Sequence, residues 1–578
     1  MKRSSVQFIG EFARAHPGRS VLMVVFLVLA GLAEGIGLIT MLPVINSMIA
    51  EDAGEGDRLA EMIEAAFGAL GIEPTLNVLL LVLVGGITAK AVLVWLGMLQ
   101  VGYTIARVTL DLRLRLIRSM MKARWSYFVR QPLGGFANAV ASEARRASNA
   151  YKEACSAAAS VIQAFAYFLV AVAISWPVAL TGVIAGAGFI FALRGFVRMS
   201  RSAGGQMTEM MTSLTDRLTD TVHGIKAMKA MGQEHQYAPI LEERTKGLET
   251  AQRKQVLAIE SMQLLQEPII AAIIAIGLVL LLTFGEMAFS SILLLIFIFY
   301  RLLRFVNSLQ TKMQVMVEGE SAYWSMMDKI NRAELNEEVD TGIVDPPQVN
   351  QGIIFRDVSF AYDDVMVLKN ASFEVPARSF VAIVGESGSG KTTTGDLIAA
   401  LLKPTSGKIL VDGVPLTTIR TQAWRAMIGY VPQEILLLHD SILNNVTLRD
   451  PTITLEKACE ALEMAGAWGF VQGLPEGIHE VTGERGGSLS GGQRQRIGLA
   501  RALVRDPKVL ILDEVTAALD PETEQSIAKT LRRLSADVTI LSISHRSTMN
   551  DLADLVLEVR GGTIKARSRE TEVKLPAD

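Results

Sequence analysis

The sequence predicts two domains of different kinds: an α-helical membrane domain with six spans, followed by an α/β domain with a phosphate-binding loop. Three observations predict this fold class. Runs of about 20 apolar residues recur through residues 1–310 and then stop. Strand-like and helical stretches alternate from residue 353 onward. A glycine-rich loop stands directly between one of these strands and the helix that follows it.

The chain is also too long for one hydrophobic core. It has 578 residues, of which 50% are apolar, and its mean hydropathy is +0.34; chains of this length split into several domains. The net charge of -3 gives no reason to expect a nucleic-acid partner. The two cysteines, Cys155 and Cys459, fall in different predicted domains, so we expect no disulfide framework.

Six segments meet or approach the length needed to cross about 30 Å of hydrocarbon. They lie at residues 20–49, 76–101, 155–175, 177–198, 264–284 and 288–307. The first is too long for a signal-peptide core and lacks a clear cleavage site, so we interpret it as a retained membrane helix. We therefore expect the chain to be an integral, multi-pass membrane protein.

Basic residues flanking the spans predict their orientation. Residues 51–75 hold one basic residue against seven acidic ones, whereas residues 102–152 hold ten Lys or Arg, as do residues 194–260. The first loop should therefore face outward, and the N-terminus and the second domain should be cytoplasmic. The two basic segments have helical periodicity and little Gly or Pro, so we expect long helical extensions into the cytoplasm.

The tips of these extensions are candidate contacts with the second domain. They lie at residues 125–136 and 219–233. The alternative is that both tips are solvated turns, which the aromatic cluster of Trp125, Tyr127 and Phe128 makes the weaker interpretation.

Two charges fall inside predicted spans, Glu34 in the first and Lys90 in the second. Charges within a membrane are expensive and are usually paired or face a cavity. Glu34 and Lys90 are therefore expected either to pair and fix helix packing or to line a substrate path. Arg301 and Arg304, near the inner end of the sixth span, are candidates to meet an anionic head group or to extend to the interface.

A polar, proline-containing segment separates the two halves of the chain. The expected domains are 1–325 in the membrane, 326–350 as a linker and 351–578 as the α/β domain. Strands are expected at residues 353–360, 380–384, 408–411, 428–431, 509–512, 538–542 and 555–559. Helical stretches between most of them predict a largely parallel sheet.

The glycine-rich loop follows the strand that ends at Val384 and has the phosphate-binding pattern. Its expected ATP-binding residues are Gly385, Ser387, Gly388, Ser389, Gly390, Lys391, Thr392 and Thr393. Glycines let backbone N–H groups wrap the nucleotide phosphates, and the following helix adds its positive end. Lys391 should reach the β- and γ-phosphates, and the Thr392 hydroxyl should bind Mg²⁺.

A second apolar strand, residues 509–512, ends in two carboxylates, Asp513 and Glu514. The carboxyl ends of parallel strands form the ligand-binding edge of such sheets. Asp513 is the candidate Mg²⁺ ligand. Glu514, one residue further on, is the candidate general base for the attacking water.

Between these two motifs stands a sequence that looks like the ABC signature motif. It comprises Leu489, Ser490, Gly491, Gly492 and Gln493. With it, essentially the whole chain resembles ABC transporters of the exporter type (type IV fold), and the implied fold is an α-helical six-span membrane domain followed by an α/β P-loop ABC ATPase domain. The implied cofactors are ATP and Mg²⁺.

The resemblance implies roles for further residues. Tyr362 matches the aromatic residue that stacks on adenine, and Gln433 matches the glutamine that senses the metal and the γ-phosphate. Asp520 matches the aspartate of the D-loop, and His545 matches the switch histidine at the γ-phosphate. Glu514, His545 and Gln433 are thus the catalytic candidates, and Thr392, Gln433 and Asp513 are the candidates for holding Mg²⁺.

In this family the signature motif faces the phosphate loop of the other subunit. The resemblance therefore implies that residues 489–493 and Asp520 bind ATP held by a second subunit. Every catalytic position is intact, which favours a homodimer over a heterodimer. The expected partners are thus a second copy of the chain, membrane lipid and the transported substrate.

The resemblance implies ATP-driven transport by alternating access. Residues 20–307 exclude the ABC-type ATPases that lack membrane spans. The segment 33–38 with Pro43 looks like the first helix of exporters of lipid-linked oligosaccharides, peptides or glycolipids, so the expected substrate is amphipathic: a lipid-linked oligosaccharide, a lipid or a peptide. Open alternatives are an importer on the same scaffold, with siderophore-like cargo, and one subunit of a heterodimer. The expected location is a bacterial inner membrane.

Overall fold

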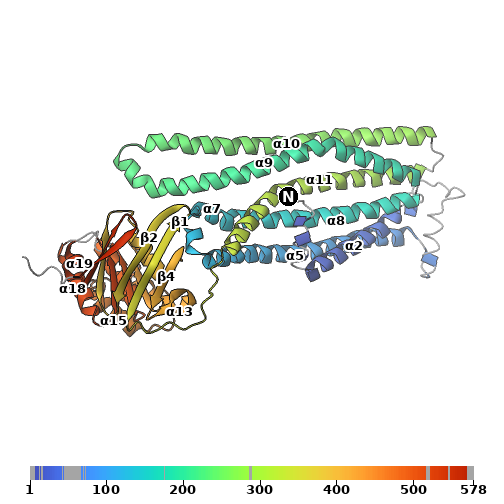
Figure 1. The fold of residues 1–578 in the computed structure, drawn as a ribbon. Coiled ribbons are helices and arrows are strands. Elements are labelled where there is room, and N and C mark those ends of the chain that lie inside the picture. The colour runs from blue at the N-terminus through green and yellow to red at the C-terminus, as the bar shows by residue number, and fades with distance from the viewer. Residues whose placement is uncertain are drawn as a thin grey trace, which may run out of the picture. The chain divides into compact units, whose positions relative to one another are not determined.

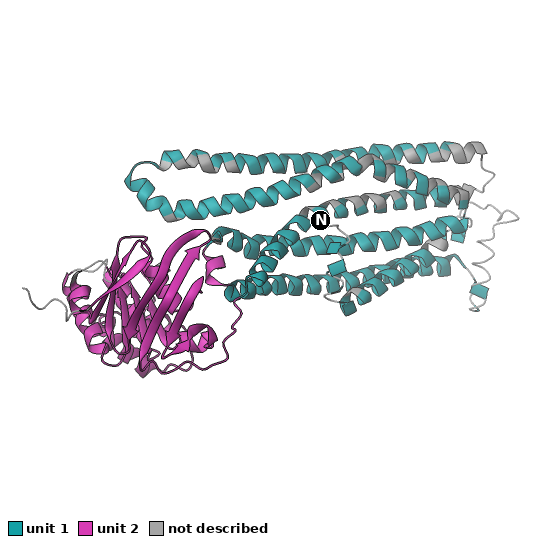
Figure 2. Cartoon of the chain, viewed as in Figure 1, with its two compact units in different colours: residues 1–123, 130–337 teal, residues 124–129, 338–578 magenta. Residues whose placement is uncertain are grey.

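The computed structural model describes most of residues 7–568. Its gaps are residues 9, 12–13, 15–16, 42, 45–66, 69–70, 72, 74, 175, 285–288, 516–520 and 545–546. The chain forms two compact units (Figure 2). Unit 1 comprises residues 1–123 and 130–337, and unit 2 comprises residues 124–129 and 338–578.

Unit 1 is helical. Its helices are α2 (Pro17–Ile39), α5 (Leu76–Lys122), α7 (Leu133–Asn138), the π-helical turn η1 (Ala139–Glu143), α8 (Ala144–Ile174), α9 (Trp176–Ala230), α10 (Glu234–Phe284) and α11 (Phe289–Leu335). The helix pairs α8 with α11, α2 with α5, and α9 with α10 pack along their lengths (Figure 1). The two basic segments lie largely in the long helices α5, α8, α9 and α10, while the extension of these helices into the cytoplasm stays a prediction.

Three helical segments among the described residues are long and apolar enough to cross a membrane. They are Pro17–Gly37, Leu76–Lys122 and Gly134–Ile174. Shorter apolar segments occur at Glu267–Ile276 and Leu293–Leu302. The helical membrane domain is thus confirmed, and the number of six spans stays a prediction.

Unit 2 contains two sheets. The larger has the strand order β10-β9-β3-β8-β7-β6, made of β3 (Phe380–Gly385), β6 (Ile428–Val431), β7 (Val509–Asp513), β8 (Thr539–Ile543), β9 (Leu555–Arg560) and β10 (Thr563–Ser568). All neighbours in it are parallel except β9 and β10. The order places β3 beside β8 and β8 beside β7, so the carboxyl ends of these strands share one edge.

The smaller sheet has the order β2-β1-β4-β5 and is antiparallel. Its strands are β1 (Gly352–Tyr362), β2 (Val365–Pro376), β4 (Ser406–Val411) and β5 (Val414–Pro415). The strands expected at residues 353–360 and 408–411 thus lie in this sheet and not in the parallel one. Short apolar runs indicate strands but do not indicate which strand pairs with which.

Helices complete the core of unit 2, some of them against strands of the larger sheet and others against neighbouring helices. They are α12 (Lys391–Ile398), α13 (Thr421–Ala426), α14 (Ile442–Thr447), α15 (Leu455–Met464), α16 (Trp468–Gln472), α17 (Gly491–Leu503), α18 (Pro521–Leu534) and α19 (Ser547–Leu552). Trp424 is fully buried in the cluster shared with both sheets, and its indole N–H donates to the Ile398 carbonyl at 2.8 Å. This bond fixes α13 against the end of α12.

The segment between the two domains is more ordered than the expected linker. α11 continues to Leu335, so the first ten residues of the range 326–350 are helical. The Asp340 carboxylate then accepts from the Thr421 N–H at 2.9 Å, and backbone hydrogen bonds lower its pKa. Arg425 donates to both oxygens of Glu338 at 2.8 and 2.6 Å. The segment from residue 338 onward is thus bonded within unit 2, while the predicted domain limits stay a prediction.

Candidate ATP-binding and membrane sites

The phosphate-binding loop connects β3 directly to α12. Gly385 has φ 153° and Gly390 has φ 108°, conformations that residues with side chains rarely adopt. A Cβ at Gly385 would lie 2.3 Å from the Val559 carbonyl oxygen. These two positions therefore require glycine, and they aim the turn at the carboxyl edge of the larger sheet.

The Lys391 ammonium lies inside this turn. It donates to the carbonyls of Gly385 at 3.0 Å and Glu386 at 2.9 Å. Burial lowers the pKa of Lys391, and the charges of Glu514 and Asp513 oppose that shift. The loop thus holds a cation where nucleotide phosphates would bind.

Thr392 and Asp513 come together across the gap between α12 and β7. The Thr392 hydroxyl donates to Asp513 Oδ1 at 3.3 Å, and only 5% of Asp513 is exposed. Burial raises the pKa of Asp513, while the hydrogen bond from Thr392 acts in the opposite direction. A hydroxyl and a carboxylate oxygen are hard donors of the kind that suit Mg²⁺.

Glu514 lies beside Asp513 and meets Gln433. The Gln433 side-chain N–H donates to Glu514 Oε2 at 2.6 Å, and the Glu514 backbone N–H donates to the Ile543 carbonyl at 2.9 Å. Glu514 has φ 50°, a left-handed conformation. This conformation and the bond to Ile543 together orient the carboxylate at the end of the strand.

The signature motif forms the start of α17. Ser490 caps the helix: its hydroxyl accepts from the Gln493 N–H at 3.2 Å, and its own N–H donates to Gln493 Oε1 at 2.8 Å. This reciprocal capping box satisfies two backbone donors that the helix would otherwise leave free. Gly491 and Gly492 form the first turn, and Leu489 packs into the core before it.

Of the other candidates for the ATP site, the structure places Tyr362 and Ser389 but does not describe Asp520 and His545. Tyr362 is 38% exposed, with its ring edge-on to Phe360 at 4.9 Å, which leaves a face available for stacking. Ser389 has a buried hydroxyl with no hydrogen-bond partner among the described residues, an arrangement that suits a phosphate oxygen as acceptor. Asp520 and His545 lie outside the described residues, and their roles stay predictions.

Asp396 is a further carboxylate near this site that the sequence analysis missed. It is 7% exposed and accepts from the Tyr430 hydroxyl at 3.4 Å. Burial, assisted by the charge of Asp513, raises the pKa of Asp396 to about 6. The only local sequence signal for Asp396 is that it directly precedes the apolar residues Leu397 and Ile398 on the helix after the phosphate-binding loop.

In unit 1, Glu34 and Lys90 form an ion pair between α2 and α5. The Tyr167 hydroxyl of α8 donates to the same Glu34 oxygen, and Lys90 lies 5.9 Å from the centre of the Phe305 ring. Sequence reasoning could not find Tyr167, because nothing local marks it as a partner. This pairing is the contact that the helix-packing alternative expects, and with Phe305 on α11 it involves four helices.

Separating this pair should destabilise the membrane unit. We expect Glu34→Gln and Lys90→Met each to reduce stability, with a coupling energy of about 1–3 kcal/mol between the two positions, because each single change leaves a buried charge without its counter-ion. The double variant should recover much of the loss. Thermal unfolding in detergent measures this cycle.

Thr88→Val is the matched control, since this hydroxyl on the same helix bonds to its own Val84 carbonyl. A coupling energy near zero, together with loss of substrate-stimulated ATP turnover, would favour the substrate-path alternative instead.

Two arginines of α11 lie over aromatic rings. Arg301 is 5.6 Å from the Phe297 ring centre, and Arg304 is 5.9 Å from that of Tyr300. Each guanidinium group is therefore partly stabilised by a cation–π contact with an aromatic ring of the same helix. Their guanidinium groups still offer donors to an anionic group.

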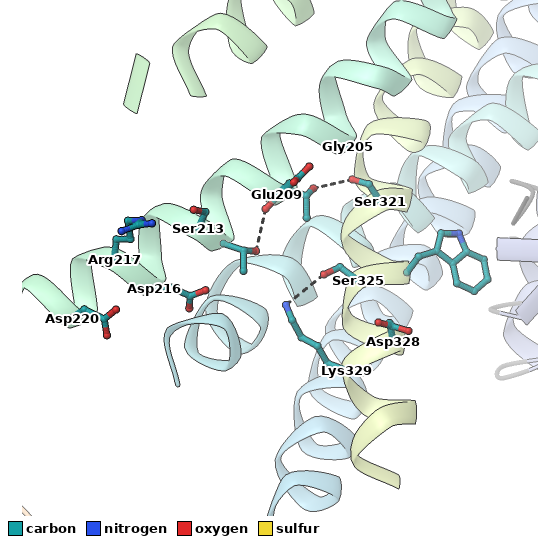
Figure 3. A pocket seen from close by; sticks show the side chains of 13 residues that line it. Gly205, Glu209, Ser213, Asp216, Arg217, Asp220, Ser321, Ser325, Asp328 and Lys329 are labelled. Atoms are coloured by element: carbon teal, nitrogen blue, oxygen red, sulfur yellow. Dashed lines mark hydrogen bonds between the residues drawn. The ribbon is translucent and has the colours of Figure 1, made fainter. Parts of the chain in front are cut away.

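A groove of about 850 Å³, lined mostly by residues with polar side chains, opens between α9 and α11 (Figure 3). Beside it, Glu143 is 1% exposed and accepts from Lys329 at 2.8 Å. Thr212 of α9 and Ser325 of α11 also donate to this Glu143 oxygen, at 3.5 and 3.3 Å. The π-helical turn that carries Glu143 is thus tied to both long helices.

Comparison with protein families matches both halves of the chain. The model described as "ABC transporter transmembrane region" matches residues 20–305, and the model described as "ABC transporter" matches residues 368–517. Together they span the membrane region and most of the motifs described above.

Two curated relatives match over nearly the whole chain, and a third matches over part of it. ATP-dependent lipid A-core flippases of Syntrophus aciditrophicus and Photobacterium profundum are each 28% identical to it. The first match covers 97% of this chain and 91% of the relative, and the second covers 94% and 92%. The alpha-hemolysin translocation ATP-binding protein HlyB of Proteus vulgaris is 38% identical, over 39% of this chain and 32% of the relative.

Among solved structures, a bacterial Atm1-family ABC exporter with ATP bound has the same fold. The TM-score is 0.80 at 23% identity, and the match covers 96% of both chains. At this identity the likeness concerns the fold alone.

Proposed function

This chain belongs to the ABC transporters of the exporter type, with one membrane region and one ATP-binding region fused as a half-transporter, and we propose that two copies of it form the working unit. The protein couples ATP hydrolysis to export or flipping of an amphipathic substrate. The observation that carries the assignment of its ATP site is the meeting of Lys391, the Thr392–Asp513 pair and the Gln433–Glu514 pair at one sheet edge.

In the proposed chemistry, Glu514 accepts a proton from the water that attacks the γ-phosphate. Its carboxylate ends a buried strand and is held by Gln433, which restricts its orientation. Lys391 supplies positive charge to the phosphates, and the backbone N–H groups of the loop bind their oxygens. Tyr362 stacks on the adenine ring, and His545 contacts the γ-phosphate.

Thr392, Asp513 and Gln433 are the residues that would hold Mg²⁺ with the nucleotide. Oxygen donors from a hydroxyl, a carboxylate and an amide fit this ion. When bound, Mg²⁺ neutralises charge on the β- and γ-phosphate oxygens.

The dimer follows from the position of the signature motif in the family. Residues 489–493 and Asp520 of one subunit are proposed to bind the ATP held by Lys391 of the other. ATP then favours the closed state because it bridges two subunits, and hydrolysis removes that bridge. The helix tips at residues 125–136 and 219–233 are proposed to transmit the change to the membrane region.

For the substrate we propose a lipid-linked saccharide. The names of the two full-length relatives support a lipid, whereas HlyB matches over too small a share of its length to indicate cargo. Arg301 and Arg304 are the proposed contacts with an anionic head group. The bacterial relatives support a location in a bacterial inner membrane, with the ATPase in the cytoplasm.

Substrate-stimulated ATP turnover tests this function. In lipid nanodiscs, we expect the purified chain to hydrolyse ATP above the Glu514→Gln variant, and a lipid-linked saccharide to raise the rate further. Phospholipids and peptides serve as comparison substrates. Stimulation by peptides alone would contradict the proposed substrate, and no turnover under any condition would contradict the homodimer and favour a heterodimer.

Direction is tested separately with inside-out vesicles. An exporter accumulates its substrate inside them when ATP is added outside. Absence of ATP-driven accumulation, with turnover intact, would favour the importer.

A further inference from the structure

One fully buried amide in unit 2 joins three segments that serve different parts of the ATP site. Asn445, on α14, is 0% exposed. We propose that Asn445 is a positioning residue that holds the loop after Gln433 and the segment before Ser490 as one body. This inference rests on the dimer proposed above. In that dimer, Gln433 senses the nucleotide bound by its own subunit, and the signature motif of the same subunit binds the ATP held by the partner. Asn445 would relay the nucleotide state from the first of these ATP sites to the second.

The first segment held by Asn445 is the loop that follows Gln433. The Asn445 Oδ1 atom accepts from the Leu438 N–H at 2.8 Å, and its side-chain nitrogen donates to the Leu438 carbonyl at 2.9 Å. The same nitrogen lies 3.1 Å from the Ser441 carbonyl. The Asp440 carbonyl and the Thr482 hydroxyl also lie within reach of this nitrogen, at 3.3 and 3.4 Å. An amide nitrogen has two hydrogens, so these acceptors satisfy it, and residues 438–441 are held in one conformation.

The second segment leads to the signature motif. The Thr482 hydroxyl, 1% exposed, donates to the Leu438 carbonyl at 2.8 Å, and the Thr482 N–H donates to the Asp440 carbonyl at 3.0 Å. The Ser488 hydroxyl donates back to the Thr482 carbonyl at 2.8 Å. The chain from Thr482 to the capping residue Ser490 is therefore bonded to the same loop as Asn445.

The third segment is the signature helix itself. Arg501 of α17 donates to Asn445 Oδ1 at 3.0 Å and to the Asn445 carbonyl at 2.7 Å. Its remaining terminal nitrogen donates to the Leu436 carbonyl at 3.0 Å. Arg501 thus bonds the helix that begins at Gly491 to the loop that begins at Gln433.

The buried polar side chains around Asn445 indicate that this residue positions the segments bonded to it. A buried amide needs every donor and acceptor satisfied, and a satisfied polar network fixes one geometry, whereas an apolar side chain of the same size would permit several. Two neighbours of Asn445 Oδ1, the Leu438 N–H and Arg501, are donors only, which also fixes the orientation of the amide. Movement of residues 436–441, which follow Gln433, would therefore displace the signature segment or break these bonds.

The test compares an isosteric variant with a matched control in full-length protein in nanodiscs. Asn445→Asp keeps the shape and the acceptor that faces Arg501, but it places oxygen against the carbonyls of Leu438 and Ser441. Thr482→Val removes the second bond to Leu438 with less disturbance. The control is Asn444→Ala, the neighbouring residue on α14, whose amide bonds to the Asp440 carboxylate at 2.8 Å.

Three quantities are measured for each variant: turnover, its Hill coefficient for ATP, and the affinity for a fluorescent ATP analogue without Mg²⁺. We expect Asn445→Asp to lower turnover about tenfold or more and the Hill coefficient to fall to about 1. Affinity without Mg²⁺ should change less than about twofold. Thr482→Val should act in the same direction to a smaller extent, and Asn444→Ala should match the wild type.

Other outcomes overturn the inference. Wild-type turnover and cooperativity in Asn445→Asp would show that the junction relays nothing. Equal losses of turnover and of nucleotide affinity would show a general structural role. If Asn445→Asp is not recovered as a folded protein, Thr482→Val decides by the same criteria. If the wild-type protein showed no ATP turnover, the proposed function itself would be contradicted. That result differs from a failure of the relay, in which the wild type turns over ATP and the variants do not differ from it.

Discussion

The Glu514→Gln variant is expected to bind ATP with nearly wild-type affinity and to lose about 10²- to 10⁴-fold in turnover, the range for removing a general base. The amide is the same size as the carboxylate and can still accept the hydrogen bond that Gln433 donates at 2.6 Å. The site should therefore keep its geometry. It loses a group able to take the proton from the attacking water.

Two measurements check this prediction: steady-state phosphate release and direct binding of ATP. Glu460→Gln is the matched control, because Glu460 is an exposed carboxylate on α15 of the same unit. Turnover by Glu514→Gln within about tenfold of the wild type would contradict the general-base role. Loss of ATP binding would indicate that the carboxylate supports the site structurally.

The sequence was sufficient for the parts of this site that depend on local order. A strand, a glycine-rich turn and a helix follow one another at residues 380–398, and the structure places Lys391 inside that turn. A buried strand ending in Asp513 and Glu514 similarly required only its own residues. Motifs of this type can be predicted because short-range geometry determines where their side chains point.

Pairings between distant segments were harder to predict. Gln433 and Glu514 could be placed near one another only through the resemblance, and Tyr167 was not foreseen as a partner of Glu34. The strand β2 was missed, because a half-exposed strand with charged residues carries a weak apolar signal. Which strands and side chains meet depends on the whole chain, and a single sequence does not determine it.

The junction at Asn445 shows the same limit within a well-ordered unit. Its side chain meets residues 438–441, which are close in sequence, but also Thr482 and Arg501, which are far away. The sequence around it, Asn444-Asn445-Val446, contains no motif that marks the amide as buried. Only the three-dimensional contacts reveal that its amide is fully buried and fully bonded.

Replacing Lys391 with alanine is expected to weaken ATP binding by about 10- to 100-fold and to abolish measurable turnover at ordinary ATP concentrations. A hydrogen bond to a charged group contributes about 1.5–3 kcal/mol, and each 1.4 kcal/mol is about tenfold in affinity. Lys391 is the cation enclosed by the phosphate loop, and it also donates to the Gly385 and Glu386 carbonyls. The variant therefore loses both the phosphate contact and internal support of the loop.

Equilibrium binding of ATP, measured directly, separates this effect from a defect in chemistry. Lys403→Ala is the matched control, since Lys403 is an exposed lysine shortly after α12 and lies outside the loop. The contrast with Glu514→Gln is the sharper result: one variant should fail to bind ATP, and the other should bind it without hydrolysis. If Lys391→Ala bound ATP as tightly as the wild type, the ammonium would have to act only after binding, and its assignment as a phosphate ligand in the resting site would be wrong.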